Sequence, residues 1–181
     1  MAADIPRLLE PALLQSILEP TAVDNNLIVV DLCSDALYRQ KHVPGAVHLQ
    51  PGVLMAGTAP YPGKLPTIEQ LTNIIQYLGI DAGSHVVIYD DEGGGWAGRF
   101  AWTLDLLGYQ NWSYLNGGIV AWIREGFATE SQANQATASN TSVSIANPTV
   151  WVSTDDIISQ LGNSDFAVWD ARSPGEYSGD M

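Results

Sequence analysis

Cysteine and basic residues are scarce in this sequence. Cys33 is the only cysteine among 181 residues, which excludes an internal disulfide and a zinc site built on several cysteines. Lysine and arginine number 7 against 20 aspartate and glutamate residues, so the formal net charge is −13. Because a phosphate backbone is bound by clustered cations, this charge argues against a nucleic-acid partner. The 3 histidines are scattered along the chain and predict no metal site.

Long apolar runs are missing as well. No stretch approaches the roughly 20 residues needed to span a bilayer. The opening residues 1–7 lack the basic start and apolar stretch of a signal peptide. Basic clusters of the kind that bind anionic lipids are also absent. We therefore expect a soluble, cytoplasmic protein with no membrane partner, and the hydrophobic content of 46% is typical of a folded chain.

Apolar segments of strand type alternate with segments of helical period. Short apolar runs predict strands at 27–31, 46–49, 85–89 and 112–115. Helical patterns lie between and after these runs, at 34–41, 67–78, 97–107 and 119–125. Thr67 and Gln70 form a capping-box sequence at the start of the second helix. This alternation with short connections predicts an α/β fold, an open parallel sheet with helices on both faces.

The character of the chain changes over residues 128–149, which are rich in Ser, Thr, Asn, Gln and Ala. Because this segment is poor in large apolar groups, we interpret it as a linker that lies over the surface. A helix over 153–161 and a strand over 166–170 are expected after it. We therefore predict a first domain over 1–127, a linker over 128–149, and an incomplete second domain over 150–181.

An internal repeat relates the two ends of the chain. Asp31, Ser34 and Tyr38 recur as Asp170, Ser173 and Tyr177, at one constant offset (170 − 31, 173 − 34 and 177 − 38 all give 139). The second copy is too short to form a core of its own. Its apolar side chains have no complete core to enter, so we expect them to favour self-association. These side chains are Ile157, Ile158, Leu161, Phe166 and Trp169.

Several short motifs occur in an order and spacing that resemble a known family. They are Val30-Asp31, Ser34, Tyr38, His42-Val-Pro-Gly-Ala46, Val86-Val-Ile-Tyr89 with a loop to Arg99, Leu107-Gly-Tyr109 and Asn116-Gly-Gly118. Residues 5–127 resemble a rhodanese domain, and residues 150–181 resemble the start of a second one. The whole is similar to the tandem-domain thiosulfate or 3-mercaptopyruvate sulfurtransferases. The resemblance implies transfer of sulfane sulfur from one of these donors to a thiophilic acceptor such as cyanide, through a cysteine persulfide.

The resemblance places the persulfide cysteine directly after the strand predicted at 85–89, where this sequence has Asp90. A carboxylate cannot accept sulfane sulfur, and the acids that come after Asp90 would repel both a thiolate and an anionic donor. The resemblance also implies that the first domain of tandem members is commonly silent, with Asp at this place. We therefore expect no catalytic residue, metal or cofactor in this chain, and a small anionic sulfur donor only in the full-length protein. The expected degenerate active-site loop, or domain interface, consists of Asp90, Asp91, Glu92, Gly93, Gly94, Gly95 and Arg99.

Cys33 and Arg99 could in principle be functional residues, but we interpret both as structural. Cys33 corresponds in the repeat to Arg172, at the turn after the first predicted strand. A lone cysteine is more often a small buried hydrophobe than a nucleophile, so we assign it no catalytic role. Arg99 could hold an anion, but we expect it to pair locally with the three acids of the loop.

Three other interpretations stay open. Residues 93–98 contain G-x-G-x-x-G between a strand and a helix, the dinucleotide-binding pattern, although three carboxylates precede it and no acidic residue ends the next strand. Asp31, Asp90 and Asp91 at strand ends could ligate magnesium, although no phosphate-binding loop accompanies them. A non-catalytic rhodanese-like module that binds or regulates a partner would differ only in the residues after Met181.

Overall fold

The computed structural model describes residues 5–19, 26–59 and 61–180; residues 1–4 of the predicted first domain, and Met181, lie outside this part. The chain divides into two compact units, Met1–Val150 and Trp151–Met181. The first unit contains a five-stranded sheet. Among the described residues, no helix has the length and apolar character needed to cross a membrane.

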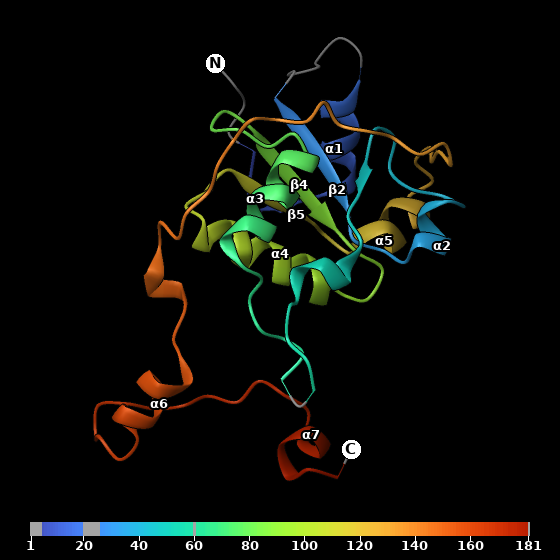
Figure 1. Cartoon of the computed structure of the whole chain (residues 1–181). Coiled ribbons are helices and arrows are strands. Elements are labelled where there is room, and N and C mark those ends of the chain that lie inside the picture. The colour runs from blue at the N-terminus through green and yellow to red at the C-terminus, as the bar shows by residue number, and fades with distance from the viewer. Residues whose placement is uncertain (1–4, 20–25, 60, 181) are drawn as a thin grey trace. The chain divides into compact units, whose positions relative to one another are not determined.

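The sheet is parallel throughout, with strand order β1-β5-β4-β2-β3 (Figure 1). Its strands are β1 Leu8–Leu9, β2 Leu27–Asp31, β3 Val47–His48, β4 His85–Tyr89 and β5 Trp112–Leu115. β2 and β4 are neighbours and pair along their whole length, from Leu27 with His85 to Asp31 with Tyr89. Their carboxyl ends therefore meet at one edge of the sheet, and Asp90 begins the loop that leaves this edge.

Helices cover both faces of the sheet, as the sequence predicted. The helical segments of the first unit are α1 Pro11–Leu18, α2 Asp35–Tyr38, η1 Pro51–Leu54, α3 Ile68–Tyr77, α4 Gly95–Leu106, α5 Gly118–Arg124 and η2 Pro148–Val150. α3 and α4 share one apolar core with Val86 and Ile88 of β4. α1 and α5 share the other core with Val87 and Tyr89. Because successive strand residues point to opposite faces, one continuous apolar strand contributes to both cores.

The local signals in the sequence account for most of these elements. The capping box at the start of α3 is confirmed: Gln70 N donates to Thr67 Oγ1 at 3.2 Å, and Thr67 N donates to Gln70 Oε1 at 2.9 Å. β3 is shorter than the predicted strand at 46–49. β1 was not predicted, because two residues are too few to form a recognisable pattern. It is defined by its pairing with β5, in which Leu8 lies opposite Tyr114.

Residues 130–147, which we call the strap, contain no helix or strand and run along the first unit. Two features hold the middle of the strap against the end of α3. The Ser139 amide donates to the carbonyl oxygen of Gln76 at 3.1 Å. A Cβ atom at Gly79 would lie 2.6 Å from the carbonyl oxygen of Thr137, so only glycine lets the strap approach this closely.

The carboxyl end of the strap is fixed by α4. The Ala146 and Asn147 amides both donate to the carbonyl oxygen of Leu106, at 3.1 and 3.0 Å. Just beyond the strap, the Trp102 indole Nε1 donates to the carbonyl oxygen of Val150 at 2.8 Å. The strap is thus part of the first compact unit, although its polar sequence carries no signal for these contacts.

The second unit contains α6 Thr154–Gln160 and α7 Pro174–Ser178, each preceded by a serine capping box. The predicted strand over 166–170 is wrong: no strand forms in the described part of this unit. A strand needs a neighbouring strand for its backbone hydrogen bonds, and these residues supply none of their own. Several large apolar side chains stay exposed as a result: Ile158, Leu161, Val168, Trp169 and Tyr177.

Candidate functional site

The loop between β4 and α4 is organised around the buried carboxylate of Asp90, whose residue is 1% exposed. Oδ1 accepts hydrogen bonds from the amides of Glu92 at 3.1 Å and Gly94 at 2.8 Å. Oδ2 accepts one from the amide of Ala97 at 2.9 Å, in the first turn of α4. A loop that turns its amides inward at a helix amino terminus is an anion-binding arrangement. Here the anion is the side chain of the loop's own first residue.

The backbone of Asp90 is held from the opposite side by the start of α5. The Ile119 amide donates to the Asp90 carbonyl oxygen at 3.2 Å. Gly118 has φ +57°, and a Cβ atom there would lie 2.1 Å from the same oxygen. Glycine is therefore required at position 118, both for its positive φ and for this close approach.

A cleft of about 300 Å³ lies beside the loop. Its polar and large side chains are those of Ser34, Gln50, Met55, Asp91, Glu92 and Trp96. Asp91 is partly exposed, Glu92 is exposed, and no lysine, arginine or histidine lines the cleft. Two carboxylates without a neighbouring cation repel anions, so this cleft does not suit thiosulfate or a similar donor by itself.

The expected ion pair between Arg99 and the acids of the loop is wrong. Arg99 turns away from them: Nη2 donates to the carbonyl oxygens of Leu54 at 3.1 Å and Gly63 at 3.0 Å. Its guanidinium also lies over the Trp102 ring, 4.8 Å from the ring centroid. Burial lowers the pKa of Arg99. Arg99 therefore ties the segment after β3 to α4, a role that the sequence could not indicate because backbone carbonyls carry no sequence signature.

Asp31 and Tyr89 form a buried pair at the carboxyl ends of β2 and β4. The Tyr89 hydroxyl donates to Asp31 Oδ2 at 2.5 Å and accepts a hydrogen bond from the Val43 amide at 3.1 Å. Asp31 Oδ1 accepts one from the Cys33 amide at 2.7 Å. Burial raises the pKa of Asp31, against the opposing effect of the hydrogen bonds from Tyr89 and Cys33. Burial and the nearby Asp31 charge raise the pKa of Tyr89. This pair joins two strands to the turn before β3, and sequence analysis did not predict it.

Cys33 is buried, as the sequence analysis expected, with none of its surface exposed. Burial and the neighbouring carboxylate of Asp31 raise the pKa of its thiol. The thiolate is the nucleophilic form, so both effects disfavour a reaction at this sulfur. The residue is also absent from the lining of the cleft beside Asp91. Nothing in this geometry lets Cys33 replace a persulfide cysteine.

The hydrogen bonds of the loop do not support the interpretation of residues 93–98 as a dinucleotide site. They give no support either to a magnesium site at Asp31, Asp90 and Asp91. The amides of Gly94 and Ala97, which a pyrophosphate would need, already bind Asp90. Asp31 is likewise engaged by Tyr89 and by a backbone amide. Within residues 5–19, 26–59 and 61–180, no group of three or more His, Cys, Asp or Glu side chains could hold a metal ion.

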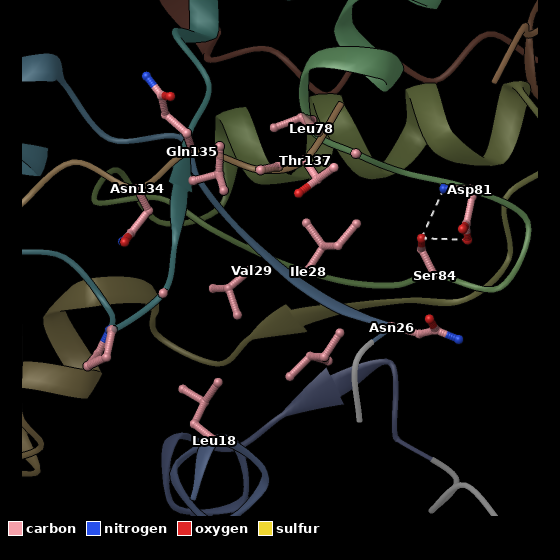
Figure 2. Close-up of a pocket in the computed structure, with 16 residues that line it drawn as sticks. Leu18, Asn26, Ile28, Val29, Leu78, Asp81, Ser84, Asn134, Gln135 and Thr137 are labelled. Atoms are coloured by element: carbon pink, nitrogen blue, oxygen red, sulfur yellow. Dashed lines mark hydrogen bonds between the residues drawn. The ribbon is translucent and has the colours of Figure 1, made fainter. Parts of the chain in front are cut away.

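A larger cavity, of about 450 Å³, lies at the opposite edge of the sheet, beside the amino ends of β2 and β4 (Figure 2). Asn26, Ile28 and Ser84 line it from the sheet, and Asn134 and Thr137 line it from the strap. The whole length of β4 separates this cavity from the loop at its carboxyl end. It therefore belongs to a different part of the domain from the candidate site.

The protein is an α/β domain with a parallel five-stranded sheet, in which the amides of the loop after β4 surround an anion. Residues 11–125 match the family model of the rhodanese-like domain, so the chain belongs to this family. Over 179 residues it is 42% identical to the thiosulfate sulfurtransferase of Azotobacter vinelandii. Over 177 residues it is 39% identical to the thiosulfate sulfurtransferase of Pseudomonas aeruginosa.

These two relatives are longer than this chain. In both comparisons the match covers 98% of the chain and 64% of the relative. The solved structure of SseA from Escherichia coli, a protein described with the 3-mercaptopyruvate sulfotransferases, has the same fold at a TM-score of 0.84 and 22% identity. That match covers 97% of this chain and 69% of the solved one.

Proposed function

We propose that this chain is the catalytically silent first part of a sulfurtransferase. The complete enzyme would move sulfane sulfur from thiosulfate or 3-mercaptopyruvate to a thiophilic acceptor such as cyanide. The observation that carries this proposal is the buried Asp90 carboxylate, which fills the anion cradle at the position where the family's chemistry needs a cysteine. The sequence identity of 42% and 39% to two thiosulfate sulfurtransferases supports the proposed reaction class.

The chemistry requires a soft nucleophile that this chain does not supply. A thiolate attacks the outer sulfur of thiosulfate, forms a persulfide and releases sulfite; cyanide then takes the outer sulfur as thiocyanate and restores the thiolate. Oxygen anions of Asp90 cannot form such an intermediate, and the thiol of Cys33 is buried. The reacting cysteine is therefore proposed to lie in the part of the protein that is present in the relatives and absent here.

We further propose the domain organisation that the sequence suggests: a first rhodanese-like domain over 1–127, a linker over 128–149 and the start of a second domain over 150–181. The boundary between the compact units at Val150 supports the beginning of the second domain. The loop from Asp90 to Gly95, with its acidic mouth, would then be a degenerate active-site loop offered as a docking surface. A basic surface on the rest of the protein would complement it.

The experiment compares the 181-residue chain with the product of the same reading frame continued beyond Met181. Each protein is mixed with thiosulfate or 3-mercaptopyruvate and cyanide, and thiocyanate is measured. We expect no thiocyanate from the chain above that from a Cys33→Ser control, and turnover from the longer product. Thiocyanate from the wild-type chain but not from the control would contradict the silent role. A longer product inactive with both donors would instead favour a non-catalytic binding or regulatory module.

Two narrower aspects of function are proposed on sequence grounds. The chain is expected to reside in the cytoplasm and to bind neither membrane nor nucleic acid, because its basic residues are few and scattered. Self-association through the incomplete repeat is supported by the exposed apolar side chains of the second unit.

A further inference from the structure

The cavity at the amino ends of β2 and β4 is enclosed by the sheet on one side and by the strap on the other (Figure 2). Its volume of about 450 Å³ lies within the range of small-molecule sites in proteins. In Figure 2, Asp81 and Ser84 lie at one end of the cavity and Asn134 lies at the other, with Ile28 between them. No residue of the loop that begins at Asp90 lines this cavity, so a ligand bound here would be separate from the sulfurtransferase chemistry.

The strap is attached to the first unit on both sides of this cavity. On one side the Asn134 amide donates to the Tyr38 hydroxyl at 3.0 Å. On the other side the Ser139 amide donates to the carbonyl oxygen of Gln76 at 3.1 Å. Residues 135–137, which line the cavity, lie between these two attachments. The cavity therefore exists before a ligand binds, and a preformed site loses little free energy through ordering on binding.

Asp81 is the one charged side chain among the described residues that line the cavity. Its Oδ1 accepts hydrogen bonds from the Gly83 amide at 2.8 Å and from the Ser84 hydroxyl at 3.0 Å. The side chain is exposed, and neither of these bonds uses Oδ2, which is therefore available to a donor. Because a carboxylate accepts hydrogen bonds and donates none, this end of the cavity suits a positively charged donor and repels an anion.

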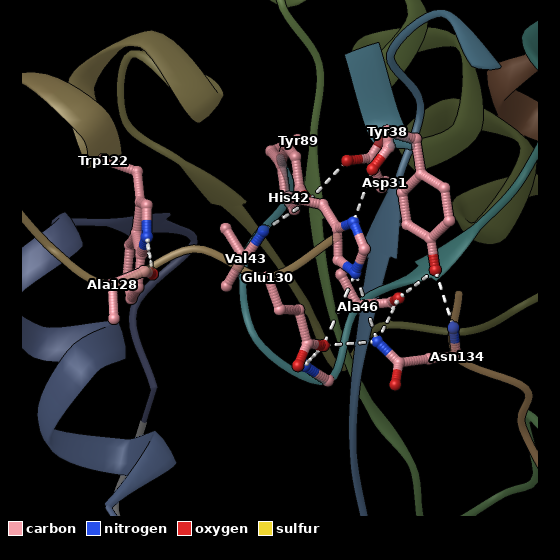
Figure 3. Close-up of polar contacts among 11 residues, drawn as sticks. Asp31, Tyr38, His42, Val43, Ala46, Tyr89, Trp122, Ala128, Glu130 and Asn134 are labelled. Atoms are coloured by element: carbon pink, nitrogen blue, oxygen red, sulfur yellow. Dashed lines mark hydrogen bonds and ion pairs between the residues drawn. The ribbon is translucent and has the colours of Figure 1, made fainter. Parts of the chain in front are cut away.

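Asn134 supplies a hydrogen-bond acceptor at the opposite end of the cavity. Its side-chain nitrogen donates to the carbonyl oxygen of Ala46 at 3.1 Å and to Glu130 Oε1 at 2.5 Å (Figure 3). The same nitrogen lies 3.4 Å from Nε2 of His42. The side-chain oxygen Oδ1 has no hydrogen-bond partner in the part of the chain that the structure describes, so it can accept a hydrogen bond from a ligand. The nearby carboxylate of Glu130 adds a negative potential that also favours a cation.

The cavity also has an apolar part. Ile28 and Val29 of β2 line it, together with Leu78 at the carboxyl end of α3. Side chains of this kind bind an alkyl chain and give a polar group no hydrogen bond. No lysine, arginine or histidine occurs among the described lining residues, so a bound anion would not be neutralised. The lining therefore fits a linear molecule that has an alkyl chain and a positively charged end.

We propose that this cavity binds a linear aliphatic amine. An ammonium group donates to Oδ2 of Asp81, and the alkyl chain packs on Ile28 and Leu78. A second donor at the far end of the ligand reaches Oδ1 of Asn134. The net charge of −13 favours the approach of such a cation. This binding is independent of the sulfurtransferase proposal, because the loop after β4 takes no part in it.

NMR titration of the whole chain with cadaverine, a linear diamine, tests this proposal. We expect the backbone amide signals of Gly83 and of residues 134–137 to shift. Pentanol has the same alkyl chain without a charge, and pentanoate has a negative end, so both should bind at least ~3-fold more weakly. The absence of shifts, or equal affinity for pentanol, would overturn the proposal. So would shifts confined to residues 141–144, which line a neighbouring cavity, or to residues 91–92.

Matched substitutions of aspartate identify the carboxylate that binds the amine. In Asp81→Asn the side chain keeps Oδ1 as an acceptor for Gly83 and Ser84, so the turn is retained while the charge is lost. We expect the dissociation constant for cadaverine to rise at least ~3-fold. Asp165→Asn is the control, because it removes an exposed carboxylate of the second unit and should leave the affinity unchanged. Unchanged affinity in Asp81→Asn, or an equal loss in both variants, would overturn the proposal.

Discussion

The backbone amide of Ala97 donates a hydrogen bond to Oδ2 of Asp90 at 2.9 Å, so a buried carboxylate lies at the amino end of α4. The same inward amides would stabilise a thiolate or a persulfide. In this chain they stabilise a side chain that cannot take part in sulfur transfer. The loop thus has the conformation of an anion cradle, and the carboxylate of its own first residue occupies the cradle.

Removal of this internal anion should destabilise the first unit. In Asp90→Ala the amides of Gly94 and Ala97 lose their acceptor, which we expect to lower the free energy of unfolding by about 2–4 kcal/mol. Urea unfolding followed by tryptophan fluorescence measures the change. Asp91→Ala is the matched control, since Asp91 is partly exposed, and it should cost about 0.5 kcal/mol or less. Equal effects of the two substitutions would contradict the capping role of Asp90.

Position 118 should tolerate no side chain. The methyl group of an alanine at position 118 would collide with the Asp90 carbonyl oxygen, and the alanine backbone would have to adopt a positive φ. We expect Gly118→Ala to lower the free energy of unfolding by about 2–4 kcal/mol. Gly98→Ala in α4 is the control, because its Cβ would meet nothing within 4 Å, and it should stabilise the helix by roughly 0.5–1 kcal/mol. A Gly118→Ala protein as stable as Gly98→Ala would show that the close approach is not rigid.

The pair of Asp31 and Tyr89 predicts a pH-dependent effect. In Tyr89→Phe the Val43 amide loses its acceptor and Asp31 loses a donor, so the chain should lose about 2–3 kcal/mol of stability at neutral pH. Burial raises the pKa of Asp31, and the Tyr89 hydrogen bond lowers it. An acid with a raised pKa stabilises the fold most below its unfolded value, near 3.8, and this contribution is lost as pH rises through the folded value. Without the hydroxyl the pKa rises further.

The measurement for this pair is a series of unfolding curves from about pH 4 to about pH 8. The difference between Tyr89→Phe and the wild type should grow as the pH rises. Tyr109→Phe is a control, because Tyr109 is a partly buried tyrosine whose pKa is raised by burial and by Asp81, with no contribution from Asp31. A constant difference between Tyr89→Phe and wild type at all pH values would contradict the link to Asp31.

The hydrogen bonds of Arg99 should protect the segment after β3 from proteolysis. In Arg99→Met the stem can still pack on Trp102, but the carbonyl oxygens of Leu54 and Gly63 lose their donor. We expect thermolysin to cut within residues 55–63 at least several times faster, with about 1–2 kcal/mol lost from the free energy of unfolding. Arg124→Met on α5 is the control, since its side chain is exposed. Unchanged cleavage in Arg99→Met would exclude the clamp.

Self-association should depend on the exposed apolar residues of the second unit. Trp169 is 92% exposed and Val168 is 60% exposed. The chain should therefore sediment as a concentration-dependent mixture, and the double substitution Val168→Ser and Trp169→Ser should shift it toward monomer. Tyr61→Ser removes an exposed aromatic from the first unit and should leave the distribution unchanged. A wild-type monomer at all concentrations would contradict this expectation.

The repeat illustrates how one sequence position behaves differently in two surroundings. Asp31 in the first copy is buried in a sheet, and burial raises its pKa. Asp170, its equivalent, is exposed, and hydrogen bonds from Arg172 lower its pKa to about 2. The sequence predicted a strand ending in aspartate in both places. Only the first copy has neighbouring strands to pair with, so only the first forms the strand.

The sequence was informative where structure is local. The capping box of α3 and the apolar runs of β2 and β4 are encoded within a few neighbouring residues, and all three elements form as predicted. Contacts between segments that are distant in the sequence could not be predicted from such local patterns. Arg99 was assigned to nearby acids because they are close in sequence, yet it binds two carbonyl oxygens more than thirty residues away. The contacts between His42 and Glu130 could likewise not be predicted, because the polar residues of the strap have no periodicity.

The hydrogen bond from the Trp102 indole to the carbonyl oxygen of Val150 gives this protein an optical probe of its own. If the segment around Val150 detaches from α4, the indole of Trp102 loses its carbonyl partner and binds water, and its fluorescence emission moves to longer wavelength. Because the sequence has 6 tryptophans, the difference between the emission of the wild type and that of a Trp102→Phe variant would report this detachment without an attached dye.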